Sequence, residues 1–532
     1  MNFLSNMTNL TYAEEPSQIH ELQSLVNANS KSLLLNFPSI PLSQPIYGCS
    51  EINGQFQFGL SPDFDKKLLS KHDIPTYEAI SDILTETSNL YSTHVNVIDK
   101  QPVVKRLFGV YLENGLIGLC EEIVNSKPNQ QIPNILKTVS SGLIKIIDAI
   151  NGPFNPLMLS KKEHEMNFAF IKGSNWKSSL IHAFQWHPHC NKYAVAFKND
   201  IVKVYSNKQG HAILKHQNQV NITCLAWKPF YSSIIAVGCA NAIIIWDTDS
   251  STVSLKPSSS CSFVLSKRYH NDIMDIQWYP KSDFLLSVAS KDNEIIIWDV
   301  TLKSCVPVKR IGNTGFSLAR FSPNGFKLFT ADLSTSFRIW KPTNYTSEKW
   351  INLYSRCNAA CWSPDGSILL FTCDDCPLLY SLRFLNSEKQ ELEVVCDLSS
   401  ISLFENMNDQ SQIDTSAISR YTIGGSINDM SWDPTGQRLA ISFKKKTTDS
   451  HINVVAIFLT KFQPQFQVLP CGFVNDMENA FPVNLSFKPE FESGALLTIS
   501  WSNSRIQHVP FYFNRIVDDY GAPQTITSLS CY

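Results

Sequence analysis

The feature that most constrains this 532-residue chain is a short pattern that recurs seven times: an aromatic residue, any residue and a proline. Successive copies begin 41, 51, 43, 41, 70 and 55 residues apart. A repeat of about 40 to 45 residues is the period of a four-stranded propeller blade. The pattern therefore predicts an all-β, seven-bladed β-propeller. The copies are Trp186-His187-Pro188, Trp227-Lys228-Pro229, Trp278-Tyr279-Pro280, Phe321-Ser322-Pro323, Trp362-Ser363-Pro364, Trp432-Asp433-Pro434 and Phe487-Lys488-Pro489.

A second aromatic residue ends a β-rich segment 18 to 20 residues after each of the first five copies. Two of these residues are followed by aspartate, and the Trp-Asp dipeptide is characteristic of WD repeats. Turn sequences such as Pro364-Asp365-Gly366 are typical of tight connections between antiparallel strands. We therefore interpret the repeats as WD-type blades. The second aromatics are Tyr205, Trp246, Trp298, Trp340 and Tyr380.

The third copy has residues at the spacings of a buried hydrogen-bond network that ties the strands of WD repeats together. This expected tetrad is His270, Ser290, Asp292 and Trp298. We expect it to be structural. Other copies lack the aspartate, so most blades must rely on apolar packing; its place is taken by Asn199, Ala240 and Ser334.

The charge and hydropathy of the chain argue against several classes of function and location. A net charge of −2 argues against direct nucleic-acid binding, which needs a clustered basic surface. No N-terminal segment has the basic start, apolar core and cleavage site of a secretory signal. No apolar run reaches the roughly 20 residues of a membrane-spanning helix. We therefore expect a cytosolic or nuclear protein whose membrane contacts are made through a partner.

The chain has 14 cysteines, and one cluster has spacing that suits a metal. Four thiolates could bind zinc there. Because Cys357 and Cys361 fall on one face of a strand that leads into Trp362, we favour reduced, buried thiols and expect no cofactor. The cluster comprises Cys357, Cys361, Cys373 and Cys376.

The composition changes where the repeats begin, since all 11 tryptophans lie beyond residue 175. We divide the chain into a weakly ordered lead-in over residues 1–60, an amphipathic helical annex over 61–175, the propeller over 176–515 and a short tail over 516–532.

A propeller must close its ring, and in WD-type propellers the outer strand of the last blade comes from the segment before the first blade. The alternating sequence at 55–60 is one candidate for this strand, and residues 511–513 are another. A polar insertion at 399–420 is predicted to be a surface excursion or a loop that contacts a partner.

Apolar residues recur at steps of three and four over residues 104–123 and again over 135–150, and a capping box begins at Ser160. These patterns predict three amphipathic helices in an N-terminal extension. Their apolar faces either pack on each other and on the propeller or form a docking surface. The candidate docking residues are Phe108, Tyr111, Leu112 and Leu116.

Residues 184–196, Phe-Gln-Trp-His-Pro-His-Cys-Asn-Lys-Tyr-Ala-Val-Ala, are far more specific than a generic WD repeat. They resemble the aladin family of WD-repeat nucleoporins. The resemblance continues through Leu225–Pro229, Arg356–Ser367, Leu469–Gly472 and Trp501–Ile506, and it covers roughly residues 178 to 515.

This resemblance implies a peripheral component of the nuclear pore complex, held at the nuclear envelope by an integral-membrane nucleoporin of the pore membrane. It also implies contacts with other nucleoporins, a part in nucleocytoplasmic transport of cargo, and a link to spindle proteins at the spindle pole in mitosis. A propeller of low net charge with an amphipathic annex is suited to binding proteins, which agrees with such a role.

The sequence contains no phosphate-binding loop, nucleophile elbow or paired-histidine zinc motif. The best candidate for metal or acid–base chemistry is the group His182, His187 and His189, which has no carboxylate or cysteine partner in the pattern. We therefore predict a non-enzymatic scaffold. The alternative is a soluble WD-repeat adaptor such as a ubiquitin-ligase substrate receptor, and an enzymatic propeller is the third interpretation.

Overall fold

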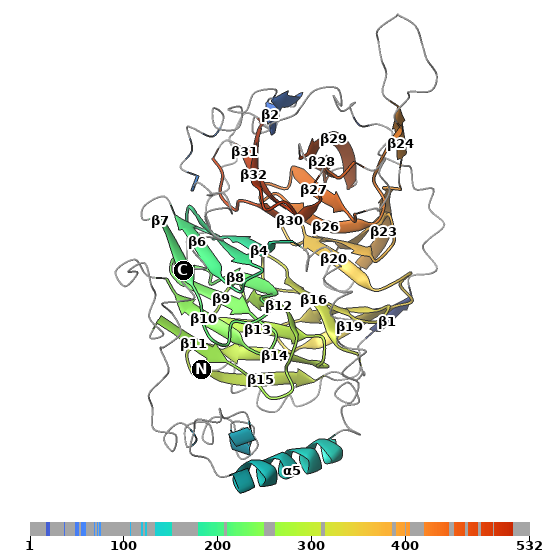
Figure 1. Ribbon diagram of the computed structural model, residues 1–532. Coiled ribbons are helices and arrows are strands. Elements are labelled where there is room, and N and C mark those ends of the chain that lie inside the picture. Colours follow the sequence, from blue (N-terminus) through green and yellow to red (C-terminus); the bar gives the residue numbers. More distant parts are fainter. Residues whose placement is uncertain are drawn as a thin grey trace, which may run out of the picture.

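The computed structural model describes most of residues 179–513, the helix at 134–151, and N-terminal stretches at 18–21, 37, 48–52 and 55–59, with single residues and pairs between 69 and 124. Seven sheets surround a common axis and form a seven-bladed β-propeller (Figure 1), which confirms the predicted fold. The innermost strand of each blade contacts the innermost strand of the next, and β30 of the last blade contacts β4 of the first.

In each of blades 1 to 6, four antiparallel strands follow one another in chain order from the inner edge to the outer edge. Blade 1 is β4 (Ile181–Trp186), β5 (Lys192–Phe197), β6 (Val202–Ser206) and β7 (Gly210–Leu214). Blade 2 is β8 (Cys224–Trp227), β9 (Ile234–Gly238), β10 (Ile243–Asp247) and β11 (Ser262–Leu265). Blade 3 is β12 (Ile273–Trp278), β13 (Phe284–Ala289), β14 (Glu294–Asp299) and β15 (Ser304–Lys309). Blade 4 is β16 (Phe316–Phe321), β17 (Leu328–Asp332), β18 (Phe337–Lys341) and β19 (Thr346–Ile351).

Blade 5 is β20 (Cys357–Trp362), β21 (Ile368–Cys373), β22 (Leu378–Phe384) and β23 (Gln390–Asp397). A hairpin of β24 (Ile401–Phe404) and β25 (Arg420–Ile423) precedes blade 6 and marks the polar insertion, whose residues 405–419 lie outside the described part. Blade 6 is β26 (Ile427–Trp432), β27 (Arg438–Phe443), β28 (Val454–Lys461) and β29 (Gln467–Asn475). Blade 7 contains β30 (Pro482–Phe487), β31 (Gly494–Trp501) and β32 (Ile506–Tyr512).

The recurring aromatic ends the inner strand of its blade, and in blades 2, 3 and 5 its indole N–H ties that blade to the preceding one. Trp227 Nε1 donates to the Gln185 carbonyl at 3.2 Å, and Trp278 Nε1 donates to the Ala226 carbonyl at 3.1 Å. Trp362 repeats the contact with the Arg320 carbonyl at 3.0 Å. Each acceptor comes directly before the aromatic of the previous blade, so the sequence repeat is also a repeated hydrogen bond between blades.

The inner strands carry a second repeated feature, a one-residue register shift four positions before the aromatic in six of the seven blades. Such a bulge redirects one side chain. At this position, Ser317 Oγ donates to the Cys357 carbonyl at 3.5 Å, and Asn358 Nδ2 donates to the Ile427 carbonyl at 3.0 Å. The bulged residue therefore reaches the inner strand of the next blade.

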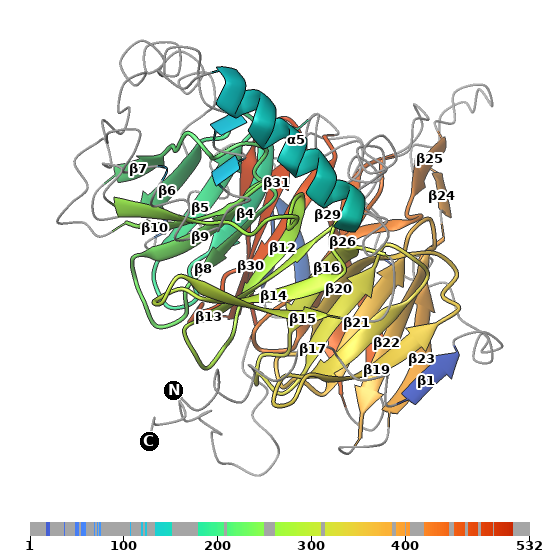
Figure 2. The ribbon, with the colours of Figure 1, turned by 90° about the horizontal axis from the view of Figure 1, so that it is seen from below.

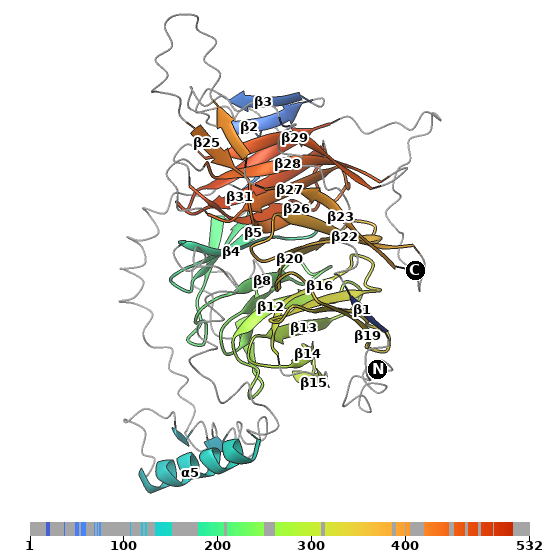
Figure 3. The same cartoon turned by 90° about the vertical axis from the view of Figure 1, so that its right-hand side faces the viewer.

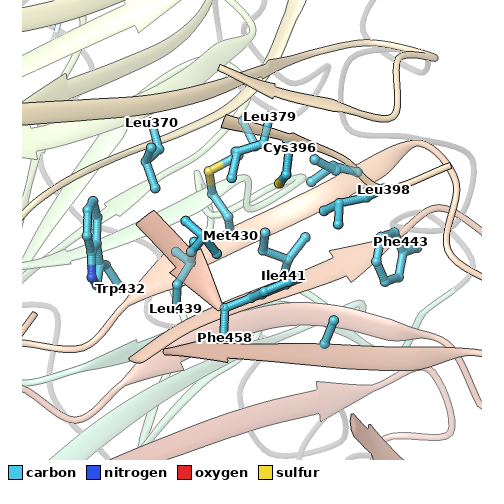
Figure 4. Packing of buried hydrophobic residues seen from close by; sticks show 14 of the residues in the cluster. Leu370, Leu379, Cys396, Leu398, Met430, Trp432, Leu439, Ile441, Phe443 and Phe458 are labelled. Atoms are coloured by element: carbon cyan, nitrogen blue, oxygen red, sulfur yellow. The ribbon is translucent and has the colours of Figure 1, made fainter. Parts of the chain in front are cut away.

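The hydrophobic core lies in the seams between blades. The buried apolar residues form seven clusters, and each cluster joins two neighbouring blades. Figure 4 shows the seam of blades 5 and 6, where Leu370 and Leu379 face Met430 and Ile441. Because each sheet buries both faces, adjacent strand residues are buried together, as in β21 and β27.

The last blade is completed by the N-terminal part of the chain. Strand β2 (Gly48–Ile52) pairs in parallel with β32, and β3 (Gln55–Gly59) pairs with β2 at the outer edge. The candidate at 55–60 is thus the outermost strand, while residues 511–513 lie at the end of β32. Neither candidate is the strand that bonds to β32. Sequence pattern misses β2 because Cys49, Ser50 and Glu51 are all buried and show no alternation.

Other N-terminal residues also contact the blades, although we expected little fixed structure in the lead-in. Strand β1 (Gln18–Glu21) pairs in parallel with β19 of blade 4 (Figure 2). Phe37 stacks on Phe473 of blade 6 with ring centres 4.2 Å apart. Tyr193 of blade 1 donates its hydroxyl hydrogen to the Pro75 carbonyl at 3.2 Å. The described N-terminal residues therefore contact blades 4, 6, 7 and 1.

The pattern at 135–150 forms the predicted helix, α5 (Asn134–Asn151). It lies outside the ring, beyond β15 in Figures 1 and 3. The capping box at Ser160 and most of the 104–123 pattern lie outside the described residues. No helix in the described part of the chain is long and apolar enough to span a membrane.

Candidate interaction surfaces

The hydrogen-bond network expected in blade 3 is present, with one change of residue. His270 Nδ1 lies 2.9 Å from Asp292 Oδ2, and His270 Nε2 lies 2.8 Å from Ser287 Oγ. Trp298 Nε1 donates to the same Ser287 oxygen at 2.8 Å. The network joins the loop before β12 to β13, the turn after it and β14. It holds one blade together, and all four of its side chains are buried.

The serine of this network is Ser287 and not the expected Ser290. Ser287 pairs with Ile296, two residues before Trp298, so its side chain lies on the same face of the sheet as the indole. Ser290 follows the end of β13, and its buried hydroxyl has no hydrogen-bond partner among the described residues. Blade 4 supports the corrected position, because Trp340 Nε1 donates at 2.8 Å to Thr330, the equivalent residue of β17.

Of the three histidines near the first repeat, His182 lies in β4, His189 Nδ1 lies 3.3 Å from Glu490 Oε1, and His187 holds a structural turn. His187 Nδ1 accepts the backbone N–H groups of His189 at 3.0 Å and Cys190 at 2.9 Å. The ring hydrogen therefore lies on Nε2, 3.0 Å from the Tyr231 carbonyl. Burial lowers the pKa of His187 to about 4, so the ring is neutral near pH 7. Both nitrogens are occupied by backbone groups, which leaves no lone pair for a metal.

The cysteine cluster lies in the core of blade 5. Cys357 pairs directly with Cys373 across β20 and β21, and both side chains are buried. Burial raises the pKa of Cys373 to about 12 and that of Cys357 well above its usual range. Zinc binds the thiolate form, which this environment disfavours. Among the residues that the structure describes, no group of three or more histidine, cysteine or acidic side chains could hold a metal ion.

The candidate docking residues Phe108, Tyr111, Leu112 and Leu116 lie outside the described residues, so they remain a prediction. The neighbouring helix α5 is described, and it presents an apolar stripe to solvent. Ile135 is 78% exposed, Val139 56% and Ile146 59%. Ser140, on another side of the helix, is buried. Five exposed aliphatic side chains on one helix form an unusual surface for a soluble domain.

A second group of exposed apolar side chains lies on the propeller itself. In an antiparallel blade, the turn after the first strand and the turn after the third strand lie at the same end. We call this end of blades 2 to 5 the turn face. It carries Phe230, Tyr231, Leu302, Phe326 and Leu385, whereas the described residues of the opposite end expose only Val220 and Tyr354 among large apolar residues of the blades.

Comparison with known proteins gives three findings. The family described as the aladin seven-bladed propeller matches residues 162–512. Aladin from Arabidopsis thaliana is 26% identical over 360 residues, which cover 63% of this chain and 76% of that protein. The transcriptional corepressor LEUNIG_HOMOLOG from the same plant is 24% identical over 196 residues, which cover 36% of this chain and 22% of that protein.

Among solved structures, a chain of the mitotic checkpoint complex crystal structure aligns with a TM-score of 0.45 and 13% identity, and the match covers 63% of this chain and 90% of that one. The family match spans all seven blades, including the repeats that carry the inter-blade hydrogen bonds. The chain therefore belongs to the aladin family of seven-bladed β-propeller proteins.

Proposed function

We propose that this protein is a non-enzymatic scaffold of the nuclear pore complex, held at the nuclear envelope by an integral-membrane nucleoporin and supporting nucleocytoplasmic transport. The observation that carries the proposal is the family match over the whole propeller. The interior of the ring supports a scaffold role, because the buried side chains of His270, Asp292 and His187 are hydrogen-bonded to other groups of the fold. A rigid ring of this kind offers several surfaces for protein partners.

Helix α5 is the part of the described chain best suited to dock on such a partner. Its exposed residues Ile135, Val139 and Ile146 form one stripe along the helix. Val139 follows Ile135 by four residues, and Ile146 follows Val139 by seven, which is two helical turns. An apolar helix face that lies in a groove of a partner is a common mode of protein recognition. The residues Phe108, Tyr111, Leu112 and Leu116 would extend this docking segment towards the N-terminus.

The test is live imaging of the tagged chain beside a pore marker. The structure decides which deletion is informative. Removing residues 1–175 would also remove β2 and open blade 7, whereas removing residues 76–175 leaves β1 to β3 and Pro75 in place. The informative point variant is the triple Ile135→Asp, Val139→Asp and Ile146→Asp. Its matched control is Thr138→Asp with Lys145→Asp, since both positions are exposed on the same helix.

We expect a punctate nuclear rim for the full chain and for the control, and diffuse fluorescence for the deletion and the triple variant. A Tyr111→Asp, Leu112→Asp variant tests the earlier part of the segment in the same way. Circular dichroism of each purified variant checks that the propeller stays folded. Diffuse fluorescence of a folded full-length chain would contradict the proposal and favour a soluble WD-repeat adaptor. A rim that persists in the triple variant would move the anchor away from α5.

A further inference from the structure

The seam between blades 7 and 1 differs from the other six in how the chain crosses it. In those six seams, the last strand of one blade leads along the chain into the first strand of the next, and between blades 5 and 6 it does so through the β24–β25 hairpin. Between blades 7 and 1, the chain runs instead from β3, which ends at Gly59, to β4, which begins at Ile181. No short connection therefore holds these two blades together, and the seam depends on contacts between side chains.

The apolar core of this seam is small. Among the described residues it has eight buried members, whereas the clusters of the other seams have ten to twenty. Leu496 is its only buried member from blade 7. The opposite face of the same blade contributes large buried residues such as Phe487, Trp501 and Phe511 to the seam with blade 6. Because buried apolar area stabilises such a contact, the seam with blade 1 should be the easier one to open.

Polar side chains of blade 7 take the place of apolar ones at this seam. Thr498 Oγ1 accepts the Trp186 Nε1 hydrogen from blade 1 at 3.0 Å and lies 2.9 Å from His508 Nδ1. Ser500 lies on the same face of β31 and is 1% exposed. Its hydroxyl has no hydrogen-bond partner among the described residues, and neither has His508 Nε2 or Nδ2 of Asn484, which pairs with Ser500. Unpaired buried polar groups oppose closure, because water would satisfy them once the seam opened.

An N-terminal segment lies against this seam. We call its described residues the clasp: Leu69, His72, Ile74 and Pro75. Leu69 and Ile74 pack against the apolar cluster of the seam. The Tyr193 hydroxyl of blade 1 donates to the Pro75 carbonyl at 3.2 Å. The clasp thus adds apolar contacts at the seam to which blade 7 supplies few.

The clasp also contacts blade 7. The centre of the His72 ring lies 4.6 Å from that of Phe491 and 5.9 Å from that of Tyr512. The backbone of the clasp forms a turn, because the His72 N–H donates to the Leu69 carbonyl at 2.9 Å and the Ile74 N–H donates to the His72 carbonyl at 2.8 Å. One short segment therefore contacts both blades across the seam that no short connection crosses.

We propose that the propeller opens first at the seam between blades 7 and 1, and that the clasp keeps this seam closed. Local opening of a protein begins where buried apolar contacts are fewest. The clasp belongs to the N-terminal extension, so the extension controls the state of the ring as well as completing blade 7 through β2. Every contact in this inference lies within the chain, and it does not depend on the proposed envelope anchor.

The experiment measures how fast buried thiols of the full chain react with N-ethylmaleimide, resolved by peptide mass spectrometry. Ser500→Cys places a thiol in the seam between blades 7 and 1. Native buried cysteines report on other seams of the same molecule: Cys239 between blades 1 and 2, Cys373 between blades 4 and 5, and Cys396 between blades 5 and 6. When labelling is slower than reclosing, its rate follows the population of the open seam. We expect the introduced thiol to react faster than all three native thiols.

Variants of the clasp are then combined with Ser500→Cys. Leu69→Ser with Ile74→Ser removes the apolar contacts of the clasp and should accelerate labelling at position 500 by about ten-fold or more, while the native thiols change less than about two-fold. Tyr193→Phe removes only the hydroxyl that bonds to Pro75 and should give a smaller acceleration, about five-fold.

The matched control is Glu490→Gln. It alters an exposed contact across the same seam, in which His189 Nδ1 lies 3.3 Å from Glu490 Oε1. Exposed pairs of this kind contribute little, so labelling at position 500 should change less than about two-fold.

Four results would overturn the proposal. The thiol at position 500 could react no faster than the native thiols, which would place the first opening elsewhere. The clasp variants could leave its rate unchanged. They could accelerate all four thiols equally, as a chain that loses its whole fold would, and the clasp would then stabilise the ring as a whole and not one seam. Finally, Glu490→Gln could act as strongly as the clasp double variant.

Discussion

Blades 3 and 7 differ in how the sequence supplies their strands. Blade 3 comes from one continuous stretch, residues 273–309, and its His270–Asp292–Ser287–Trp298 network lies within about thirty residues of chain. Blade 7 combines segments that are far apart in the sequence, because β2 bonds to β32. Glu51 of β2 forms a buried ion pair with Arg438 of blade 6, 387 residues away.

This contrast shows where the polar contacts of the fold matter most. A local network adds stability to a blade that its own sequence already brings together. The Glu51–Arg438 pair, with Cys471 Sγ 3.3 Å from the carboxylate, instead joins β2 of blade 7 to blade 6. A buried charge is costly when its partner is removed, so this seam should be more sensitive to mutation than blade 3.

The strongest test removes the N-terminal contribution to blade 7. Deletion of residues 1–59 takes away β1, Phe37, β2 and β3 and leaves β32 as an exposed edge. We expect the loss of a large share of the total unfolding free energy, which is about 5–15 kcal/mol for typical domains. Urea denaturation followed by tryptophan fluorescence measures it. An added peptide of residues 36–60 should recover part of the loss. An unchanged transition in the deletion would show that the ring closes without β2.

The next test breaks the buried pair alone. Glu51→Leu leaves the Arg438 guanidinium, which is 5% exposed, without its carboxylate. We expect a loss of about 3–5 kcal/mol in unfolding free energy. The double variant Glu51→Leu, Arg438→Leu should recover most of that loss, because no charge is then buried unpaired. If both variants are equally unstable, packing of β2 rather than the ion pair controls the seam.

A pH test examines the seam between blades 1 and 2. There His187 contacts Tyr231, 44 residues away, which is farther than the contacts of the blade 3 network but much nearer than Glu51 and Arg438. The pKa of His187 is about 4 in the fold and about 6.5 in the unfolded chain, so the unfolded state takes up the proton first as pH falls. The contribution of the neutral His187 ring to the free energy of unfolding is therefore complete above pH 6.5 and is lost as pH falls towards 4. Between pH 7.5 and 5, we expect a loss of about 2 kcal/mol in unfolding free energy. The variant His187→Gln should lack this component, and equal pH dependence in both proteins would contradict the assignment.

A Ser287 substitution in blade 3 should have a smaller effect than Glu51→Leu. Ser287→Ala removes an oxygen that contacts both His270 and Trp298, and we expect a loss of about 1–3 kcal/mol in unfolding free energy. Ser290→Ala is the matched control, since its buried hydroxyl has no partner among the described residues, and we expect a change within about 0.5 kcal/mol. Thermal denaturation of the two variants side by side decides between them. A larger loss for Ser290→Ala would reverse the corrected position.

Much of the ring could be predicted from the sequence because copies of the repeat make the same contact in the structure. The tryptophan of the aromatic-x-Pro pattern makes the same inter-blade hydrogen bond in blades 2, 3 and 5, so spacing alone locates the inner strands. The helix at 135–150 could be predicted for the same reason, since its apolar period matches the helical turn. Regular patterns of this kind can be recognised without knowing which distant residues are in contact.

The residues that were missed depend on partners far away in the chain or on backbone geometry. Nothing local marks Gly48–Ile52 as a strand, because its buried Glu51 is explained only by Arg438. Ser287 and Ser290 differ by three positions, and only strand register separates them. The exposed ring of Phe230 depends on a left-handed backbone that the sequence Pro229-Phe230-Tyr231 does not announce. A search for serine or threonine opposite the residue two before the tryptophan would have found Ser287 and Thr330.

The closure of blade 7 also sets an order of events during synthesis. Glu51 leaves the ribosome 387 residues before Arg438, and chains grow at about 5–20 residues per second. Phe511, which pairs with Glu51 in the sheet, follows 460 residues after it, so β2 exists without β32 for roughly 20–90 seconds, while the earlier blades already have every strand they need. During translation β2 must stay available until β32 is made, and in that time the Glu51 carboxylate and the unpaired edge of β2 are exposed to other proteins in the cell.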